Sequence, residues 1–254
     1  MKFLTFSFVL LAGISSFAEE NTKQTFRIFG TEGPYSPMKE AADAFAASNN
    51  LKIEITGKAV ESWKAAAAKD SDIIYSSSEN VMDTYNDTLS LLDAGTITTV
   101  FMRPAAILVR PGNPKKIKGV KDLIHRDLKV IIVNGQGQVA LWEDVVGRLK
   151  DIEAMQEFRK HIAFTARTTS EAIQYWKNHD EVEAFLTFNT WGKEEGLSAD
   201  IVNIEKDLVI YRSMGVAVTS ITNQRETALK FIDYLKTAEA EKIFKAKGWF
   251  KKEK

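Results

Sequence analysis

Short runs in which apolar and polar positions alternate recur along the chain, separated by segments with apolar residues at helical spacing. The alternating and wholly apolar runs predict strands at 25–29, 51–56, 72–75, 129–133, 162–165 and 184–187. The helical spacing predicts helices at 38–47, 60–69, 78–92, 118–125, 139–150, 152–160, 189–195, 226–235 and 238–247, and one that carries residues 173 and 176. Because strands alternate with helices, the pattern favours parallel pairing and the α/β class.

Two longer extended runs interrupt this alternation, at 97–110 (broken at Arg103-Pro104) and at 208–219. They divide the chain so that its first and last parts belong together and its middle part is inserted. We therefore predict a discontinuous two-lobe protein, with 19–102 plus 214–254 as lobe 1 and 103–213 as lobe 2. Such a fold has a cleft between its lobes, where ligands bind at the carboxyl ends of strands.

The N-terminus has the pattern of a secretory signal peptide. Lys2 is followed by an apolar run at 3–11 and by the small-x-small sequence Ser16-Phe17-Ala18. The run is shorter than the ~20 residues that span a bilayer, and no later segment is as apolar, so a membrane-embedded protein is not expected. The chain has no cysteine for a disulfide or a lipid anchor. We expect residues 1–18 to be removed and the mature protein to be free in a bacterial periplasm.

Composition and charge exclude several classes of function. The 254 residues carry 34 Lys plus Arg and 34 Asp plus Glu, and this balance does not favour nucleic acid or an anionic membrane as a partner. The sequence lacks a Gly-x-Ser-x-Gly elbow and a Walker-type phosphate loop, and its three histidines lack metal-ligand spacing. We expect neither an enzyme nor a cofactor. An exported enzyme on the same frame is a distant alternative.

Candidate binding chemistry lies in the loops that follow the predicted strands. Small hydroxyls, amides and glycines recur in the loops 30–36, 76–79, 134–138, 167–170 and 188–190. Each loop precedes a helix, and Ser36-Pro37 and the capping box Thr168–Glu171 mark two helix starts. Free N–H groups and helix dipoles would point at the cleft and favour an anion. Alternatively, these side chains simply cap helices.

Other residues near the predicted cleft leave alternatives open. The loop Gly135-Gln136-Gly137 fits a dinucleotide fingerprint, but two helices intervene before the next strand, which makes an anion cradle the better interpretation. Arg103 and Arg212 lie on the extended crossings, as hinge or rim residues or as members of surface ion pairs. Lys58, Lys64 and Arg167 lie close to cleft loops, and any of them could pair with a carboxylate or phosphate.

Three segments carry a resemblance to a known family: 103–114, the glycine loop running into 141–148, and Lys247-Gly248-Trp249. They resemble the accessory colonization factor C (AcfC) family of type II periplasmic solute-binding proteins. That family is akin to molybdate- and sulfate-binding proteins and to an enteric-pathogen surface antigen that binds small phosphorylated or carboxylic acids. The resemblance implies the type II fold and ligand contacts from Gly33, Tyr35, Ser62, Ser77, Ser78, Gly137, Gln138, Thr168, Thr169, Ser170, and Asn189 or Thr190.

The resulting expectation is a periplasmic protein that captures a small anion for ABC-type transport or chemoreception. The anion is an oxyanion such as sulfate or molybdate, or a small phosphorylated or carboxylic acid. The partner of the closed form would be a permease or a chemoreceptor, and a homodimer is possible. The alternative is a colonization or antigenic surface protein, interacting through its surface, with a vestigial cleft.

Overall fold

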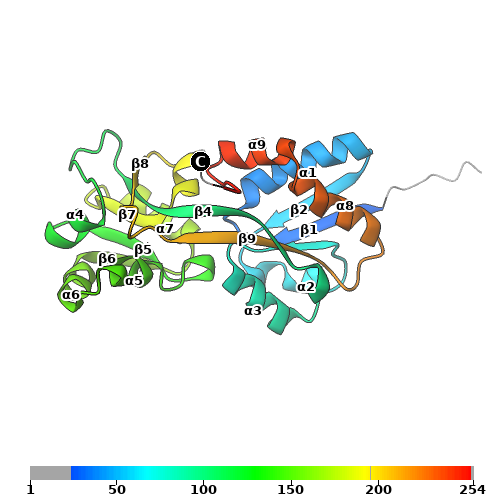
Figure 1. Ribbon diagram of the computed structural model, residues 1–254, viewed down its shortest axis with the longest axis horizontal. Coiled ribbons are helices and arrows are strands. Elements are labelled where there is room, and N and C mark those ends of the chain that lie inside the picture. Colours follow the sequence, from blue (N-terminus) through cyan, green and yellow to red (C-terminus); the bar gives the residue numbers. More distant parts are fainter. Residues whose placement is uncertain (1–23, 195, 253–254) are drawn as a thin grey trace, which may run out of the picture.

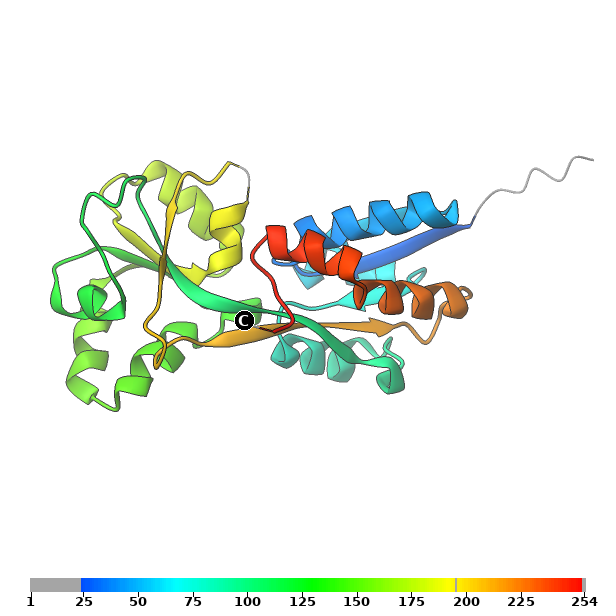
Figure 2. The same ribbon diagram turned by 45° about the horizontal axis from the view of Figure 1, so that its top comes forward.

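The computed structural model describes residues 24–194 and 196–252, so the predicted signal peptide lies outside the described residues. Two groups of helices and strands lie along the long axis of the molecule and are joined by β4 (Thr98–Val109) and β9 (Tyr211–Val218) (Figures 1 and 2). These strands correspond to the two predicted crossings. The chain therefore has the predicted two-lobe α/β fold. None of the helices in the described ranges is long and apolar enough to cross a membrane.

Lobe 1 is built on one half of a continuous sheet. Its strands follow the order β2 (Lys52–Gly57), β1 (Thr25–Gly30), β3 (Ile73–Tyr75), β9 and β4. β1 pairs in parallel with β2 and β3, whereas β9 is antiparallel to β3 and β4. Parallel pairing places the ends of β1 and β3, and the loops that follow them, at the same edge.

Helices cover both faces of this half-sheet: α1 (Tyr35–Asn49), α2 (Lys64–Ala67), α3 (Glu79–Leu89), α8 (Arg225–Leu235) and α9 (Ala238–Ala246) (Figure 1). On one face, Phe231 packs its ring 6.2 Å from that of Phe26 and 5.3 Å from that of Phe45. On the other face, Trp63 contacts Phe29 and Tyr85. The alternating apolar residues of β1 thus supply both cores.

Lobe 2 continues the sheet in the order β4, β7 (Ala184–Phe188), β5 (Val130–Val133) and β6 (Ile162–Ala166), and β8 (Asp200–Asn203) pairs with β4. Its helices are α4 (Val120–His125), α5 (Leu141–Val146), α6 (Ile152–His161) and α7 (Thr169–Asn178). Short 3-10 turns lie at Val60–Ser62, Ala94–Thr96, Gln136–Gln138, Gly147–Leu149 and Asn189–Lys193.

The apolar cores of the two lobes are separate. Buried residues of lobe 2 form one cluster between 105 and 210, and those of lobe 1 form two clusters drawn from 26–101 and 214–249. This separation supports our proposal that the lobes divide near 103 and 213.

The predicted break of the first crossing at Pro104 is wrong, because β4 runs through it. On the side away from β9, Met102 exchanges backbone hydrogen bonds with Phe250, and from Ala105 onward β4 pairs with β7 on that side. Pro104 lies between Met102, which bonds Phe250, and Ala105, where pairing with β7 begins. An N–H at this position would point away from β9, toward the side where this change of partner occurs. Its presence therefore removes no hydrogen bond from the sheet.

Local packing shifted several other predicted boundaries. α1 begins at Tyr35, not after Ser36, and Pro37 occupies its first turn, where an N–H would lack a helical partner in any case. The helix predicted at 60–69 is interrupted at Trp63, whose buried indole donates to the Lys58 carbonyl at 3.1 Å. β8 was not predicted as a strand.

Candidate functional site

A small cavity of about 10 Å³, enough for one water-sized group, lies where the two lobes meet. Its walls come from β4 and from loops that follow strands of both lobes. The lining residues are Glu32, Gly33, Ser77, Arg103, Gly135, Gly137, Gln138, Thr168, Thr169 and Trp191.

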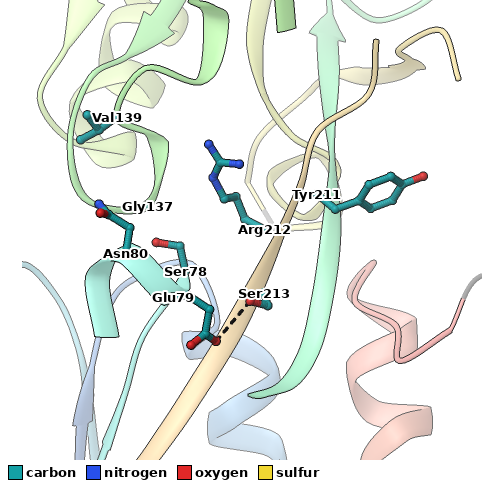
Figure 3. Close-up of a pocket in the computed structure, with 8 residues that line it drawn as sticks. All are labelled: Ser78, Glu79, Asn80, Gly137, Val139, Tyr211, Arg212 and Ser213. Atoms are coloured by element: carbon teal, nitrogen blue, oxygen red, sulfur yellow. Dashed lines mark hydrogen bonds between the residues drawn. The ribbon is translucent and has the colours of Figure 1, made fainter. Parts of the chain in front are cut away.

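Two larger grooves flank this cavity. One, of about 490 Å³, is lined by Ser78, Glu79, Asn80, Gly137, Val139, Tyr211, Arg212 and Ser213 (Figure 3). The other, of about 300 Å³, is lined by Glu32, Tyr35, Ser36, Gly57, Lys58, Ser170, Trp191 and Glu194. The shared residues Gly137, Glu32 and Trp191 connect the grooves to the small cavity, so the three spaces form parts of one interlobe cleft.

Arg103 supplies a buried positive charge to this cleft. It is 1% exposed, and its Nη1 donates to the Thr190 hydroxyl at 3.0 Å. The rings of Phe188 and Trp249 lie 4.1 Å and 4.7 Å from its Cζ. Its Nε has no hydrogen-bond partner among the described residues. The interpretation of Arg103 as a member of a surface ion pair is therefore wrong.

Desolvation is the physical cause that shifts the pKa of this guanidinium. Burial lowers the pKa of Arg103 to about 9, and no carboxylate in the described part of the chain opposes the shift. At neutral pH the side chain is still charged, because its pKa stays above 7. An unpaired buried charge costs several kcal/mol, a cost that an anion bound beside it would offset.

Arg212 lies directly opposite Arg103 in the register of β4 and β9, so both side chains project from the same face of the crossing strands. Like charges placed directly opposite one another destabilise a strand pair. Arg212 forms an ion pair with Asp144 of α5 and points into the larger groove (Figure 3). One cross-strand charge therefore has a carboxylate partner, and the other has none in the described ranges.

A chain of hydrogen bonds orients the hydroxyls on the lobe 2 wall. Thr187 donates to Gln138 Oε1 at 2.7 Å, and Gln138 Nε2 donates to the Thr169 oxygen at 2.7 Å. Because the Thr169 oxygen accepts from Gln138, its own proton is available to another acceptor. Likewise, Thr190 accepts from Arg103 and keeps a proton to donate. The wall thus presents donors rather than acceptors.

Two hydroxyls at the cleft also cap helices. Ser78 accepts from the Val81 N–H at 3.2 Å, and Thr168 accepts from the Glu171 N–H at 3.1 Å. The Glu171 carboxylate completes the second cap by accepting from the Arg167 N–H at 2.7 Å. The capping prediction for Thr168 is confirmed, and the capping interpretation applies to both hydroxyls.

Three glycines allow the loops to approach closely. A Cβ on Gly135 would lie 1.9 Å from the Arg167 carbonyl, and one on Gly33 would lie 2.9 Å from Arg103 Nη1. A Cβ on Gly137, in lobe 2, would lie 2.5 Å from the Ser77 hydroxyl of lobe 1. The Gly-x-Gly loop therefore serves loop packing and contact between the lobes.

The structure brings together most of the residues predicted for the site. Six line the small cavity: Gly33, Ser77, Gly137, Gln138, Thr168 and Thr169. Tyr35, Ser78 and Ser170 line the flanking grooves, and Thr190 binds Arg103. Ser62 does not join them, because its exposed hydroxyl bonds the Ala59 carbonyl within a tight turn. Asn189 instead donates to the Gly248 carbonyl at 2.9 Å.

The sequence predicted Arg103 only as a hinge, rim or surface residue, whereas it is the most deeply buried charge in the cleft. A signal was present, because Arg103 interrupts an otherwise apolar stretch of a strand, and charged residues are almost never fully buried unless paired. Trp191, on the 3-10 turn that follows β7, also lines the cavity.

Unpartnered buried polar atoms concentrate around the lobe junction. Five of the six such atoms in the described ranges are Thr31 Oγ1, Arg103 Nε, Asn189 Oδ1, Trp191 Nε1 and Trp249 Nε1, and the sixth, the Tyr234 hydroxyl, lies on α8 of lobe 1. Buried polar side-chain atoms usually have a hydrogen-bond partner, so each exception requires an explanation. Arg103 and Trp191 line the cavity, so an acceptor bound there would be the missing hydrogen-bond partner of both N–H groups.

A family model for bacterial extracellular solute-binding proteins matches residues 26–250. The chain belongs to this family. Among curated protein sequences, none matches it. Solved structures of solute-binding proteins are similar over nearly the whole chain. The family match itself supports a role in solute binding.

Peb3 from Campylobacter jejuni is 30% identical, with a TM-score of 0.81 over 89% of this chain and 100% of that one. PEB3 with bound L-phospholactate gives 30% identity and a TM-score of 0.82, with 89% and 100% coverage. The periplasmic molybdate-binding protein of Azotobacter vinelandii shares the fold of this solute-binding protein, at 13% identity and a TM-score of 0.69, over 90% and 100% of the chains.

Gly137→Ala tests the contact between lobes. The added methyl would meet the Ser77 hydroxyl at 2.5 Å and should hold the lobes apart, increasing the radius of gyration in small-angle scattering. Gly147→Ala is the matched control, because its Cβ meets nothing within 4 Å. Equal scattering curves for the two variants would contradict the contact.

Proposed function

We propose that this solute-binding protein captures a small anion in the interlobe cleft, with Arg103 as its principal counter-ion. The observation that carries the proposal is a fully buried guanidinium that has no carboxylate partner within the described residues and an unpartnered Nε at a cavity. A structural arginine of this depth would normally have an anionic partner in the protein.

Hydrogen-bond geometry supports an oxyanion or a small phosphorylated or carboxylic acid as the ligand. A guanidinium bonds through its N–H edges, which match two oxygens of a carboxylate, sulfate or phosphate. The hydroxyl protons of Thr169 and Thr190 can reach further oxygens. PEB3, at 30% identity, has been solved with L-phospholactate, and this supports the phosphorylated-acid class for this chain.

Ligand binding would close the lobes by a hinge motion across β4 and β9, and the closed form would be recognised by a membrane permease or a chemoreceptor. Family membership supports export, and the predicted signal peptide at 1–18 supports the periplasm as the site of action.

A thermal-shift panel tests the function. Sulfate, molybdate, citrate, phosphoglycerate, L-phospholactate and uncharged amino acids are each added to the purified mature protein. A ligand at one hundred times its Kd adds about 2.7 kcal/mol to the unfolding free energy, so one or more of the anions should clearly raise the Tm. No shift with any anion would favour the surface-interaction protein with a vestigial cleft.

Arg103→Met separates a ligand-binding arginine from a structural one. Replacing a buried charge by an apolar side chain of similar size is often neutral or stabilising, so the ligand-free Tm should be retained. The Tm shift produced by the anion should be lost.

Arg110→Met is the matched control. Arg110 stacks on Trp176 and donates to three backbone carbonyls, those of Trp176, His179 and Val182. Its loss should lower the ligand-free Tm and leave the anion-induced shift intact. A marked loss of stability in Arg103→Met with a preserved anion shift would reverse our assignment.

The double variant Ser77→Ala/Thr169→Ala tests the hydroxyls of the two walls. Neither hydroxyl caps a helix in the structure, so the fold should persist by circular dichroism. Loss of two hydrogen bonds to a charged group should weaken binding of the best anion by roughly tenfold or more, as measured by calorimetry. Unchanged affinity would remove both residues from the site.

A further inference from the structure

The C-terminal segment 247–251 returns from α9 to the strand that carries Arg103. A left-handed turn at Gly248, with φ of +87°, follows the helix. Phe250 then exchanges two backbone hydrogen bonds with Met102, at 2.8 and 2.9 Å. The Lys251 ammonium anchors the end of the segment to lobe 1 through the Lys236 carbonyl at 2.6 Å. The segment is therefore fixed directly beside Arg103.

The segment also contacts lobe 2. The Gly248 carbonyl accepts from Asn189 Nδ2 at 2.9 Å, and a Cβ on Gly248 would lie 2.9 Å from that nitrogen. Asn189 immediately precedes Thr190, whose hydroxyl receives the Arg103 N–H. Segment 247–251 is thus a further connection between the lobes, besides β4 and β9. It contacts Met102, which precedes Arg103, and Asn189, which precedes Thr190.

From these contacts we propose that segment 247–251 positions Arg103 for the anion, with Trp249 as the positioning residue. This inference rests on the proposed function of the cleft. Trp249 is 1% exposed, and its ring lies 4.7 Å from the Arg103 Cζ. Phe244 packs edge-on against that ring at 6.5 Å and so fixes it from within lobe 1.

An aromatic partner suits this role better than a carboxylate would. The π face of the ring attracts the guanidinium electrostatically. It accepts no hydrogen bond from the N–H groups that lie in the guanidinium plane. A carboxylate would hold the guanidinium equally well and would also occupy those N–H groups. The ring therefore restricts a flexible side chain before the ligand arrives, which lowers the entropy cost of binding, and leaves its donors to the anion.

The test compares Trp249→Leu with Trp249→Phe, using sulfate and L-phospholactate as probes in calorimetry on the full mature chain. Loss of the ring should weaken binding of the probe by roughly tenfold, and the smaller ring of phenylalanine should restore most of the affinity. Trp176→Leu is the matched control, because Trp176 is 2% exposed and stacks on Arg110 at 3.7 Å, in lobe 2 and outside the residues that line the cleft. Equal losses in Trp249→Leu and Trp176→Leu, or no loss in Trp249→Leu, would overturn the proposal.

A second readout needs no ligand and so separates this inference from the proposed function. The Arg103 Nε–H resonance, assigned with Arg103→Lys, should be shifted upfield by the ring currents in the wild-type protein. Trp249→Leu should move it toward the free-arginine value, and Trp249→Phe only partly. An unmoved resonance rejects the positioning role even where anions bind, whereas a moved resonance with no anion binding rejects the function of the cleft alone.

If Trp249→Leu fails to fold, Asn189→Leu tests the same segment without touching the rings. This variant removes the bond to Gly248 at an intermediate-exposure position. It should move the Arg103 resonance and weaken probe binding severalfold. Wild-type values for both quantities would overturn the proposal.

Discussion

The burial of one guanidinium without a carboxylate partner in the described ranges is the constraint on which the whole cleft depends. Desolvating Arg103 costs several kcal/mol, and a hydroxyl and two rings recover only part of it. The neighbours conform to this charge: Gly33 is a glycine because a Cβ would lie 2.9 Å from Nη1, and the C-terminal segment folds back to place Trp249 against it. The protein retains an electrostatic cost that an apolar residue would avoid, as binding sites often do.

Arg103 lies on a crossing strand, and this position connects the cost of its desolvation to the proposed movement of the lobes. β4 belongs to the sheets of both lobes, and the cavity beside Arg103 has Ser77 on one wall and Gly137 on the other, so on the proposed function the ligand lies at the hinge. On the proposed function, an anion contacts both walls only when the cleft is narrow. Its free energy of binding therefore favours the closed form, which is the differential affinity that a ligand-driven change requires.

Most of the fold could be predicted because local patterns indicate it. These are the alternation in 25–29, the apolar run at 129–133, and the two extended crossings without helical spacing. Loop composition likewise placed Ser77 and Thr169 at the cleft. The remainder depends on contacts distant in sequence. Arg103 packs against the ring of Trp249, which lies 146 positions later, and Asn189 donates a hydrogen bond to Gly248. No local pattern in the sequence indicates either contact. Ser62 was expected at the site only from the family resemblance, and no local pattern indicated that its hydroxyl would bond the Ala59 carbonyl instead.

The electrostatic field inside the cavity depends on where the charges lie more than on how many there are. The chain is formally neutral, and the cleft is lined by charges of both signs: Arg103, Arg212 and Lys58, and the carboxylates of Glu32, Glu79 and Glu194, with Asp144 paired to Arg212. These charges do not cancel in effect, because the interaction energy scales inversely with the local dielectric constant. Asp144 is committed to Arg212, and Glu32, Glu79 and Glu194 are partly exposed, so water screens them. The field inside the cavity is therefore dominated by the one charge that water does not reach, and that charge is positive.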